Sequence, residues 1–315
     1  MRAITLEGFD GGPTLRDLPV PEPGAGEVLV RVHASSVNGM DAAVASGMLK
    51  GMMEYEFPVT LGRDFAGVVE RVGSAVTRYS LGDEVFGFIA KPTLHDGSWA
   101  DFIVLPEDMF LARKPEALSF VEAGALPLAG VAALSAVEAV NPSEGERVLI
   151  VGACGGVGGY AVQLAAGRGA HVIGTTTPAD EPRLRDLGAA ETIDFTQQDV
   201  VSVVRGRYPD GVDVLIDVVK GGDGFAANAG LVRGGGRAAS TVGAANAEEL
   251  AERGVTATNV VALPEPAVLA RLAEIADAGG VTVTIQDEYR LEAAEDALRA
   301  FADAGTRGKL ALAVR

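Results

Sequence analysis

The chain has 315 residues, 48% of them hydrophobic, which is enough for one large domain or two ordinary ones with real cores. Its 43 acidic residues exceed its 26 basic ones, and the net charge of −17 argues against nucleic acid or an anionic membrane as a main partner. A single cysteine excludes an internal disulfide, and no apolar run reaches the roughly 20 residues of a membrane span or forms a secretory signal, so we expect a cytoplasmic protein.

The first third of the chain is rich in short predicted strands. Apolar and polar residues alternate over 27–34, and this pattern is typical of a half-buried strand. Residues 65–73, 83–88 and 98–104 form three further short apolar runs, with glycines in or beside the first two. Short strands joined by glycine turns, with few helices between them, predict a compact β barrel or sandwich.

The pattern changes near Pro115. Residues 119–141 are alanine-rich and predict helix, broken at Pro127. From Arg147 onward strands and helices alternate, which predicts a doubly wound parallel sheet. The six strands of that sheet are expected at 148–152, 171–175, 191–195, 212–219, 236–242 and 256–263. A helix is expected at 266–279, and the tail ends in a strand near 308–314.

A glycine-rich turn lies between the first two strands of this sheet. It reads Gly152-Ala153-Cys154-Gly155-Gly156-Val157-Gly158, directly after an apolar strand and before an amphipathic helix. Without Cβ atoms the turn lets backbone N–H groups approach a pyrophosphate, and the helix N-terminus adds unpaired donors and partial positive charge. We therefore predict a dinucleotide site formed by Ala153, Gly155, Gly156, Val157 and Gly158.

Beyond these patterns, the chain resembles the zinc-independent quinone oxidoreductases of the medium-chain dehydrogenase/reductase superfamily. The matching segments, in the family's order, are 36–41, 62–69, 76–85, 97–102, 125–130, the glycine turn, 187–189 and 308–309. The resemblance implies an α/β protein with a GroES-like β-rich catalytic domain, formed by 1–117 and 264–315. It implies a Rossmann domain for NADP over 118–263 and an active site in the cleft between the two domains.

The residues at the family's zinc-ligand positions predict that no metal is bound. Asn38 stands where zinc-dependent members have a cysteine, and Arg63 stands where they have a histidine. The three histidines of the chain lie in different segments, whereas a zinc site needs several ligands held together. Without a Lewis acid the expected reaction is hydride transfer to an electron-poor acceptor, namely a quinone or an α,β-unsaturated carbonyl.

The end of the second sheet strand bears on the choice of cofactor. NAD-specific sites usually have an acidic residue there, whereas this chain has Thr175, Thr176 and Thr177. Hydroxyl groups can donate to the 2′-phosphate of NADP, and Arg183 on the next helix would add positive charge. This predicts NADPH, although the three threonines are also consistent with a simple strand end and helix cap.

Asn38 and Tyr55 are the candidate catalytic residues. Asn38 is expected to contact the nicotinamide and the substrate, and a phenol at Tyr55 would donate a proton to the substrate oxygen. Arg63 either orients an anionic oxygen or pairs with Asp64, and Asp41 is expected to cap the following helix. Val242, Gly243 and Lys309 complete the expected cofactor contacts.

Several functions remain open at this stage. The chemistry also suits an enoyl reductase that acts on a thioester or polyketide-type intermediate. A non-catalytic NADPH-binding sensor is a third reading, favoured by Ala132, which replaces a threonine common in relatives. The apolar run 255–263 would expose an unpaired sheet edge in a monomer, so we expect a homodimer.

Overall fold

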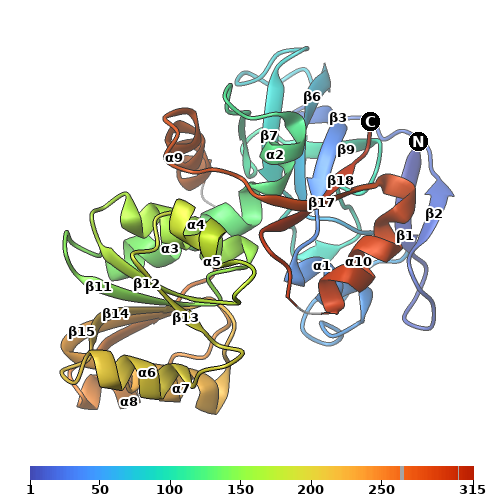
Figure 1. Cartoon of the computed structure of the whole chain (residues 1–315). Coiled ribbons are helices and arrows are strands. Elements are labelled where there is room, and N and C mark those ends of the chain that lie inside the picture. The colour runs from blue at the N-terminus through green and yellow to red at the C-terminus, as the bar shows by residue number, and fades with distance from the viewer. Residues whose placement is uncertain (263–265, 304) are drawn as a thin grey trace. The chain divides into compact units, whose positions relative to one another are not determined.

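The structure of the chain is a computed structural model, which describes residues 1–262, 266–303 and 305–315 (Figure 1). The chain forms two compact units. Unit 1 comprises Met1–Leu128, Pro264–Gly279 and Val283–Arg315, and unit 2 comprises Ala129–Leu263 and Gly280–Thr282. Each unit is described by itself below.

Unit 1 is the β-rich part of the chain. Its strands are β1 (Arg2–Leu6), β2 (Thr14–Asp17), β3 (Glu27–Ser36), β4 (Glu54–Tyr55), β5 (Val59–Thr60), β6 (Asp64–Val72), β7 (Glu84–Phe88), β8 (Thr93–Leu94), β9 (Phe102–Pro106), β10 (Leu111–Arg113), β17 (Ile285–Arg290) and β18 (Lys309–Ala313). Its helices are α1 (Gly39–Ala45), α2 (Phe120–Ala125), α9 (Pro266–Asp277) and α10 (Ala294–Ala302), with a 3₁₀ turn at Leu291–Ala293.

The main sheet of unit 1 joins both ends of the chain. Its strand order is β10-β7-β6-β3-β18-β17, with β9 also paired to β3, and a smaller sheet has the order β2-β1-β5. β18 pairs antiparallel with β3, so the C-terminal segment completes a sheet that begins near the N-terminus. This register brings the start of β18 next to the loop that follows β3, where Asn38 lies.

Two differences from the sequence expectation concern unit 1. The strand expected at 98–104 is β9 at Phe102–Pro106, because the backbone N–H groups of Ser98 and Trp99 bond to the carbonyls of Gly62 and Leu61 outside the partner strand β3. The boundary expected after residue 117 lies after Leu128, because α2 packs against β3, β6 and β18 of unit 1.

Unit 2 is a doubly wound parallel sheet. Its strands are β11 (Arg147–Val151), β12 (His171–Thr176), β13 (Glu191–Asp194), β14 (Val212–Asp217), β15 (Val232–Ser240) and β16 (Thr256–Asn259). Its helices are α3 (Pro127–Val140, which begins in unit 1), α4 (Gly156–Ala166), α5 (Glu181–Asp186), α6 (Val200–Arg207), α7 (Gly222–Ala229) and α8 (Ala247–Glu252). The strand order is β13-β12-β11-β14-β15-β16, and every pair is parallel.

Helices cover both faces of this sheet. Figure 1 shows α4 and α5 on one face and α6, α7 and α8 on the other. The strands β11, β12 and β14 are largely buried apolar runs, as expected of central parallel strands. All six strands occur in the predicted order. β16 is shorter than the expected 256–263, ending at Asn259, and Leu263 lies outside the described residues.

Among the residues that the structure describes, no helix is both long and apolar enough to cross a membrane.

Candidate functional site

The glycine turn lies at the point where the strand order of unit 2 reverses. The chain adds β12 and β13 on one side of β11, then crosses back and adds β14, β15 and β16 on the other side. Ligands of open parallel sheets bind at the carboxyl ends of the strands at such a switch point. Gly152, the first residue after β11, has φ +86°, a left-handed conformation that favours glycine.

Two glycines of the turn differ in how much space surrounds them. A Cβ on Gly158 would lie 2.1 Å from the carbonyl oxygen of Gly152, so helix α4 packs directly against the turn. A Cβ on Gly155 would have the Gly152 oxygen, at 3.6 Å, as its nearest neighbour. The turn therefore packs closely against helix α4 at Gly158 and leaves free space at Gly155. This shape fits a dinucleotide pyrophosphate.

The predicted threonine contacts lie differently from the sequence expectation. Thr175 and Thr176 are only 2% and 1% exposed. The Thr175 hydroxyl accepts from the Gly152 N–H at 2.9 Å, and the Thr176 hydroxyl donates to the carbonyl of Thr177 at 3.1 Å. Thr177 follows the end of β12 and is half-buried, so it is the most accessible of the three threonines.

Arg183 forms a hydrogen bond to the backbone of the glycine turn. Its guanidinium donates to the carbonyl of Cys154 at 2.8 Å and to the carboxylate of Asp180 at 2.5 and 2.8 Å. The Cys154 thiol donates to Thr176 at 3.3 Å, and burial raises the pKa of this thiol. Cys154 is thus a packing residue of the turn rather than an activated nucleophile.

A further residue at this edge was missed by the sequence reasoning. Asp217 ends β14 and is fully buried. Its carboxylate accepts from the backbone N–H groups of Val219 and Lys220 and from the Asn228 amide, and so fixes the loop beside the glycine turn. The sequence feature that could have revealed Asp217 is its position as an acidic residue at the end of the apolar strand β14. The loop after β15 contains the predicted residues Val242, which is 49% exposed, and Gly243.

In unit 1, Asn38 lies in a buried polar cluster with Asp64 and Lys309. The Asn38 amide donates to the Asp64 carboxylate at 2.9 Å, and its oxygen accepts from the Lys309 ammonium at 2.6 Å. Lys309 also donates to the carbonyl of Val37 and lies 3.6 Å from Asp64. The other Asp64 bonds come from the Ser36 hydroxyl and from the backbone N–H of Leu128.

This cluster changes the interpretation of Asn38. The sequence analysis expected the Asn38 side chain to contact the nicotinamide and the substrate. In the structure Asn38 is 7% exposed, and both ends of its amide are bonded to charged groups. Its loss would leave the Asp64 carboxylate and the Lys309 ammonium each short of a partner, which is costly when the groups are buried.

Asp41 lies at the first turn of α1. Asn38, not Asp41, is the N-cap residue, and the Asp41 carboxylate accepts from the Asn38 backbone N–H at 2.8 Å. The other carboxylate oxygen of Asp41 is buried without a hydrogen-bond partner. Burial raises the pKa of this carboxyl to about 7, against the opposing effect of the Arg63 and Lys309 charges.

The raised pKa of Asp41 predicts a pH-dependent stability. The folded state holds the Asp41 proton more tightly than the unfolded state, so this group's contribution falls as pH rises from about 4 to about 7. Asp41→Asn mimics the neutral form at every pH. We expect the variant to gain about 2 kcal/mol relative to the wild type at pH 8.5 and little at pH 5. Urea denaturation at both pH values measures this, and a gain confined to pH 5 would contradict it.

Tyr55 belongs to an aromatic cluster. Its ring centroid lies 4.9 Å from that of Phe9 and 5.7 Å from that of Phe57. The Tyr55 hydroxyl donates to the carbonyl of Val44 at 3.3 Å, and burial raises its pKa. At 3.3 Å this hydrogen bond is long, so it holds the Tyr55 hydroxyl only weakly. The Tyr55 ring also packs against Phe9 and Phe57.

The donor set at the zinc-ligand positions does not fit a zinc ion. The oxygen of Asn38 is already occupied by an ammonium group, and Arg63 would bring a positive charge toward a cation. Among residues 1–262, 266–303 and 305–315, no group of three or more histidine, cysteine or acidic side chains is arranged to hold a metal.

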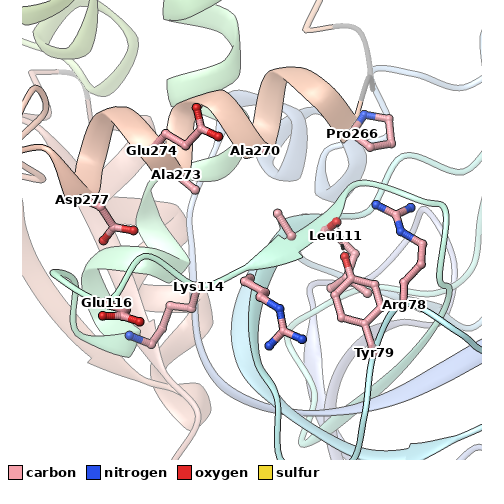
Figure 2. Close-up of a pocket in the computed structure, with 12 residues that line it drawn as sticks. Arg78, Tyr79, Leu111, Lys114, Glu116, Pro266, Ala270, Ala273, Glu274 and Asp277 are labelled. Atoms are coloured by element: carbon pink, nitrogen blue, oxygen red, sulfur yellow. Dashed lines mark hydrogen bonds between the residues drawn. The ribbon is translucent and has the colours of Figure 1, made fainter.

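A cavity of about 450 Å³ in unit 1 lies apart from these residues. It lies between α9 and the segment around β10, with Arg78 and Tyr79 at one end and Lys114, Glu116 and Asp277 at the other (Figure 2). The Tyr79 hydroxyl donates to the carbonyl of Leu111, and the Lys114 ammonium donates to the carbonyls of Pro115 and Leu118. None of the predicted site residues lines this cavity.

Comparison with known proteins gives consistent family matches. Residues 24–116 match the family described as Alcohol dehydrogenase GroES-like domain, and residues 187–312 match the one described as Zinc-binding dehydrogenase. A chloroplastic quinone-oxidoreductase homolog of Spinacia oleracea is 34% identical over 62% of this chain and 61% of its own length. A chloroplastic NADPH-dependent alkenal/one oxidoreductase of Arabidopsis thaliana is 32% identical over 70% of this chain and 57% of its own length.

The matched segments thus span about six tenths of these curated relatives. A solved structure extends the likeness to the whole chain. The quinone oxidoreductase from Coxiella burnetii is 30% identical, with a TM-score of 0.89, over 100% of this chain and 99% of that one. The fold expected from sequence, a GroES-like domain with a Rossmann-type parallel sheet, is confirmed by these matches. The chain therefore belongs to the quinone oxidoreductase family of the medium-chain dehydrogenase/reductase superfamily.

Proposed function

We propose that this protein is an NADPH-dependent oxidoreductase that transfers hydride to a quinone or an α,β-unsaturated carbonyl without a metal. The glycine turn at the switch point of the unit 2 sheet carries the proposal, because it has the shape that a dinucleotide pyrophosphate needs. The names of the Spinacia and Arabidopsis relatives, a quinone-oxidoreductase homolog and an NADPH-dependent alkenal/one oxidoreductase, support the substrate class.

In this proposal the chain's residues bind and orient, and the bound dinucleotide supplies the hydride. The backbone N–H groups of Ala153, Gly156 and Val157 face the pyrophosphate, and Gly155, whose own N–H donates to the carbonyl of Gly152, leaves room for it. Val242 and Gly243 line the nicotinamide. Quinones and enones are already electron-poor, so holding the reactants together is the main catalytic device. The proton comes from Tyr55 or from water.

The test is NAD(P)H oxidation by the purified chain with 1,4-benzoquinone and with a simple enone, each with and without a metal chelator. We expect turnover that the chelator leaves unchanged. Dinucleotide binding without turnover on either acceptor would instead identify the sensor function. Turnover on an enoyl thioester alone would identify the enoyl reductase.

The cofactor preference can be tested at Thr177. No acidic side chain follows β12 in the two positions after Thr176, and Thr177 is the accessible hydroxyl there. We expect kcat/KM to be higher with NADPH than with NADH. Thr177→Asp should lower kcat/KM for NADPH about 10-fold through repulsion of the 2′-phosphate, with little change for NADH. Equal efficiency of the wild type with both cofactors would refute the assignment.

We further propose a homodimer built on the β16 edge of unit 2. Within the described residues β16 pairs with β15 alone, and Val261 just beyond it is 67% exposed. An unpaired apolar edge favours pairing with a second copy. Light scattering at micromolar concentration should give a dimer mass, and Val261→Asp should shift it toward the monomer. Val219→Asp, at another exposed valine, is the control and should leave the mass unchanged.

A further inference from the structure

Arg63 is a buried cation without a partner in its own unit. The residue is 5% exposed, and within the described part of the chain its guanidinium makes no hydrogen bond or ion pair. The sequence left open a pair with Asp64, but that carboxylate takes its bonds from Ser36, Asn38, Leu128 and Lys309 instead. A guanidinium offers five N–H donors, so an unpaired one in this setting is rare and needs an acceptor.

The guanidinium is buried but still reachable. Among the described residues, Oδ1 of Asp41 is a polar side-chain atom that is inaccessible to solvent and has no hydrogen-bond partner. No nitrogen of Arg63 is in this condition. The small exposed fraction of Arg63 therefore includes its donor atoms. Burial lowers the pKa of this guanidinium, while the charge of Asp41 raises it.

The backbone holds Arg63 in a fixed position at the start of β6. Its carbonyl accepts from the N–H of Ile89 at 2.9 Å, and Gly62 before it packs against Trp99. The sheet fixes the backbone of Arg63, and the 5% exposure of the residue leaves its side chain little room to move. A preorganised donor of this kind stabilises charge more than a flexible one on the surface does.

An aromatic surface lies near this cation. Arg63 acts electrostatically on Tyr55, which packs with Phe9 and Phe57 in the aromatic cluster described above. Met48 and Met52 in the neighbouring loop are 73% and 75% exposed. Aromatic and methionine side chains suit a planar apolar molecule, and the guanidinium suits an oxygen on it.

We propose that Arg63 binds the carbonyl oxygen of a planar conjugated ketone or quinone and stabilises the negative charge that this oxygen gains on reduction. When a hydride from the dinucleotide forms a C–H bond at the conjugated carbon, the π electrons move to the oxygen, and the resulting enolate takes a proton from Tyr55 or from water. With a quinone, the adduct becomes the hydroquinone when the new CH2 carbon loses one proton and the second oxygen gains one. Arg63 donates to the oxygen throughout, and its bonds strengthen as the charge develops. This inference rests on the proposed function and names the residue that recognises its substrate.

The first test needs no cofactor. The probe is 4-nitrophenol, a planar molecule whose yellow anion carries its charge on one oxygen. The wild type should bind the anion and lower its apparent pKa, so that the yellow colour develops at lower pH. Arg63→Gln should weaken anion binding at least about 10-fold, and Arg63→Lys should retain much of it. The control Arg71→Gln, on the strand β6 that follows Arg63, should match the wild type.

Kinetics provide the second test. Arg63→Gln should lower kcat/KM for the quinone about 10- to 100-fold, mainly through kcat, while KM for the dinucleotide stays constant. Circular dichroism establishes whether each variant is folded. If Arg63→Gln does not fold, Arg63→Lys provides the test in its place. Folded Arg63→Gln with wild-type anion binding and turnover would overturn the inference. A wild type that binds the anion through Arg63 but reduces no acceptor would overturn the proposed function and leave the oxyanion site standing.

Discussion

Gly158→Ala should lose dinucleotide binding and much of its stability. The added Cβ would lie 2.1 Å from the oxygen of Gly152 and 2.7 Å from the Cα of Ala153, both of them backbone atoms that cannot rotate away. Helix α4 would have to move off the turn, displacing the N–H groups that face the pyrophosphate. We expect a loss of about 2–4 kcal/mol in the free energy of unfolding. We expect a fall of about 100-fold in NADPH affinity, measured by calorimetry and urea denaturation.

Gly155→Ala is the matched control, because it adds the same methyl group three residues earlier. Its Cβ has 3.6 Å of clearance, and the backbone there has φ −76°, which any residue adopts. Stability should change by less than about 1 kcal/mol. NADPH affinity should still fall if the pyrophosphate approaches this side of the turn. Equal stability losses in the two variants would show that the turn is not packed as described.

The sequence predicted unit 2 better than it predicted the direction of individual side chains there. Apolar runs located β11, β12 and β14, because central strands covered on both faces leave little polar alternation. The more polar strands β13, β15 and β16 were found within a few residues from the alternation of strands and helices. The same burial explains why the threonine expectation needed revision. Thr175 and Thr176 are adjacent on β12, so their side chains point to opposite faces, and both faces lie under helices. Only Thr177, which follows the strand, is not covered by helices in this way.

In unit 1 the sequence identified individual residues but not their interactions. Asn38 and Arg63 were singled out because they occupy metal-ligand positions of related proteins. Nothing local indicated that Lys309, 271 positions from Asn38, would donate to its amide. That contact depends on the pairing of β18 with β3, a long-range register that no periodicity reveals. The expectation that Lys309 contacts the cofactor remains a proposal, and the structure shows its ammonium inside the cluster.

Lys309→Met should strongly destabilise unit 1. The ammonium is 4% exposed and lies 3.6 Å from the fully buried carboxylate of Asp64, so its removal leaves an uncompensated charge. We expect a loss of about 3–5 kcal/mol in the free energy of unfolding, measured by urea denaturation at pH 7. Arg113→Met breaks an ion pair with Asp83 but at a side chain that is 66% exposed, and it should cost at most about 1 kcal/mol.

The double variant Asp64→Asn with Lys309→Met separates charge from packing. Asp64→Asn alone leaves the ammonium buried without its counter-ion and should cost about as much as Lys309→Met. Together the two changes remove both charges, while the amide still accepts from the Leu128 N–H and the methionine fills the space of the lysine stem. The double variant should therefore be more stable than the sum of the single losses predicts, by about 2 kcal/mol or more. Strict additivity would mean that Asp64 and Lys309 do not interact, and the buried cluster would then be held by its neutral hydrogen bonds alone.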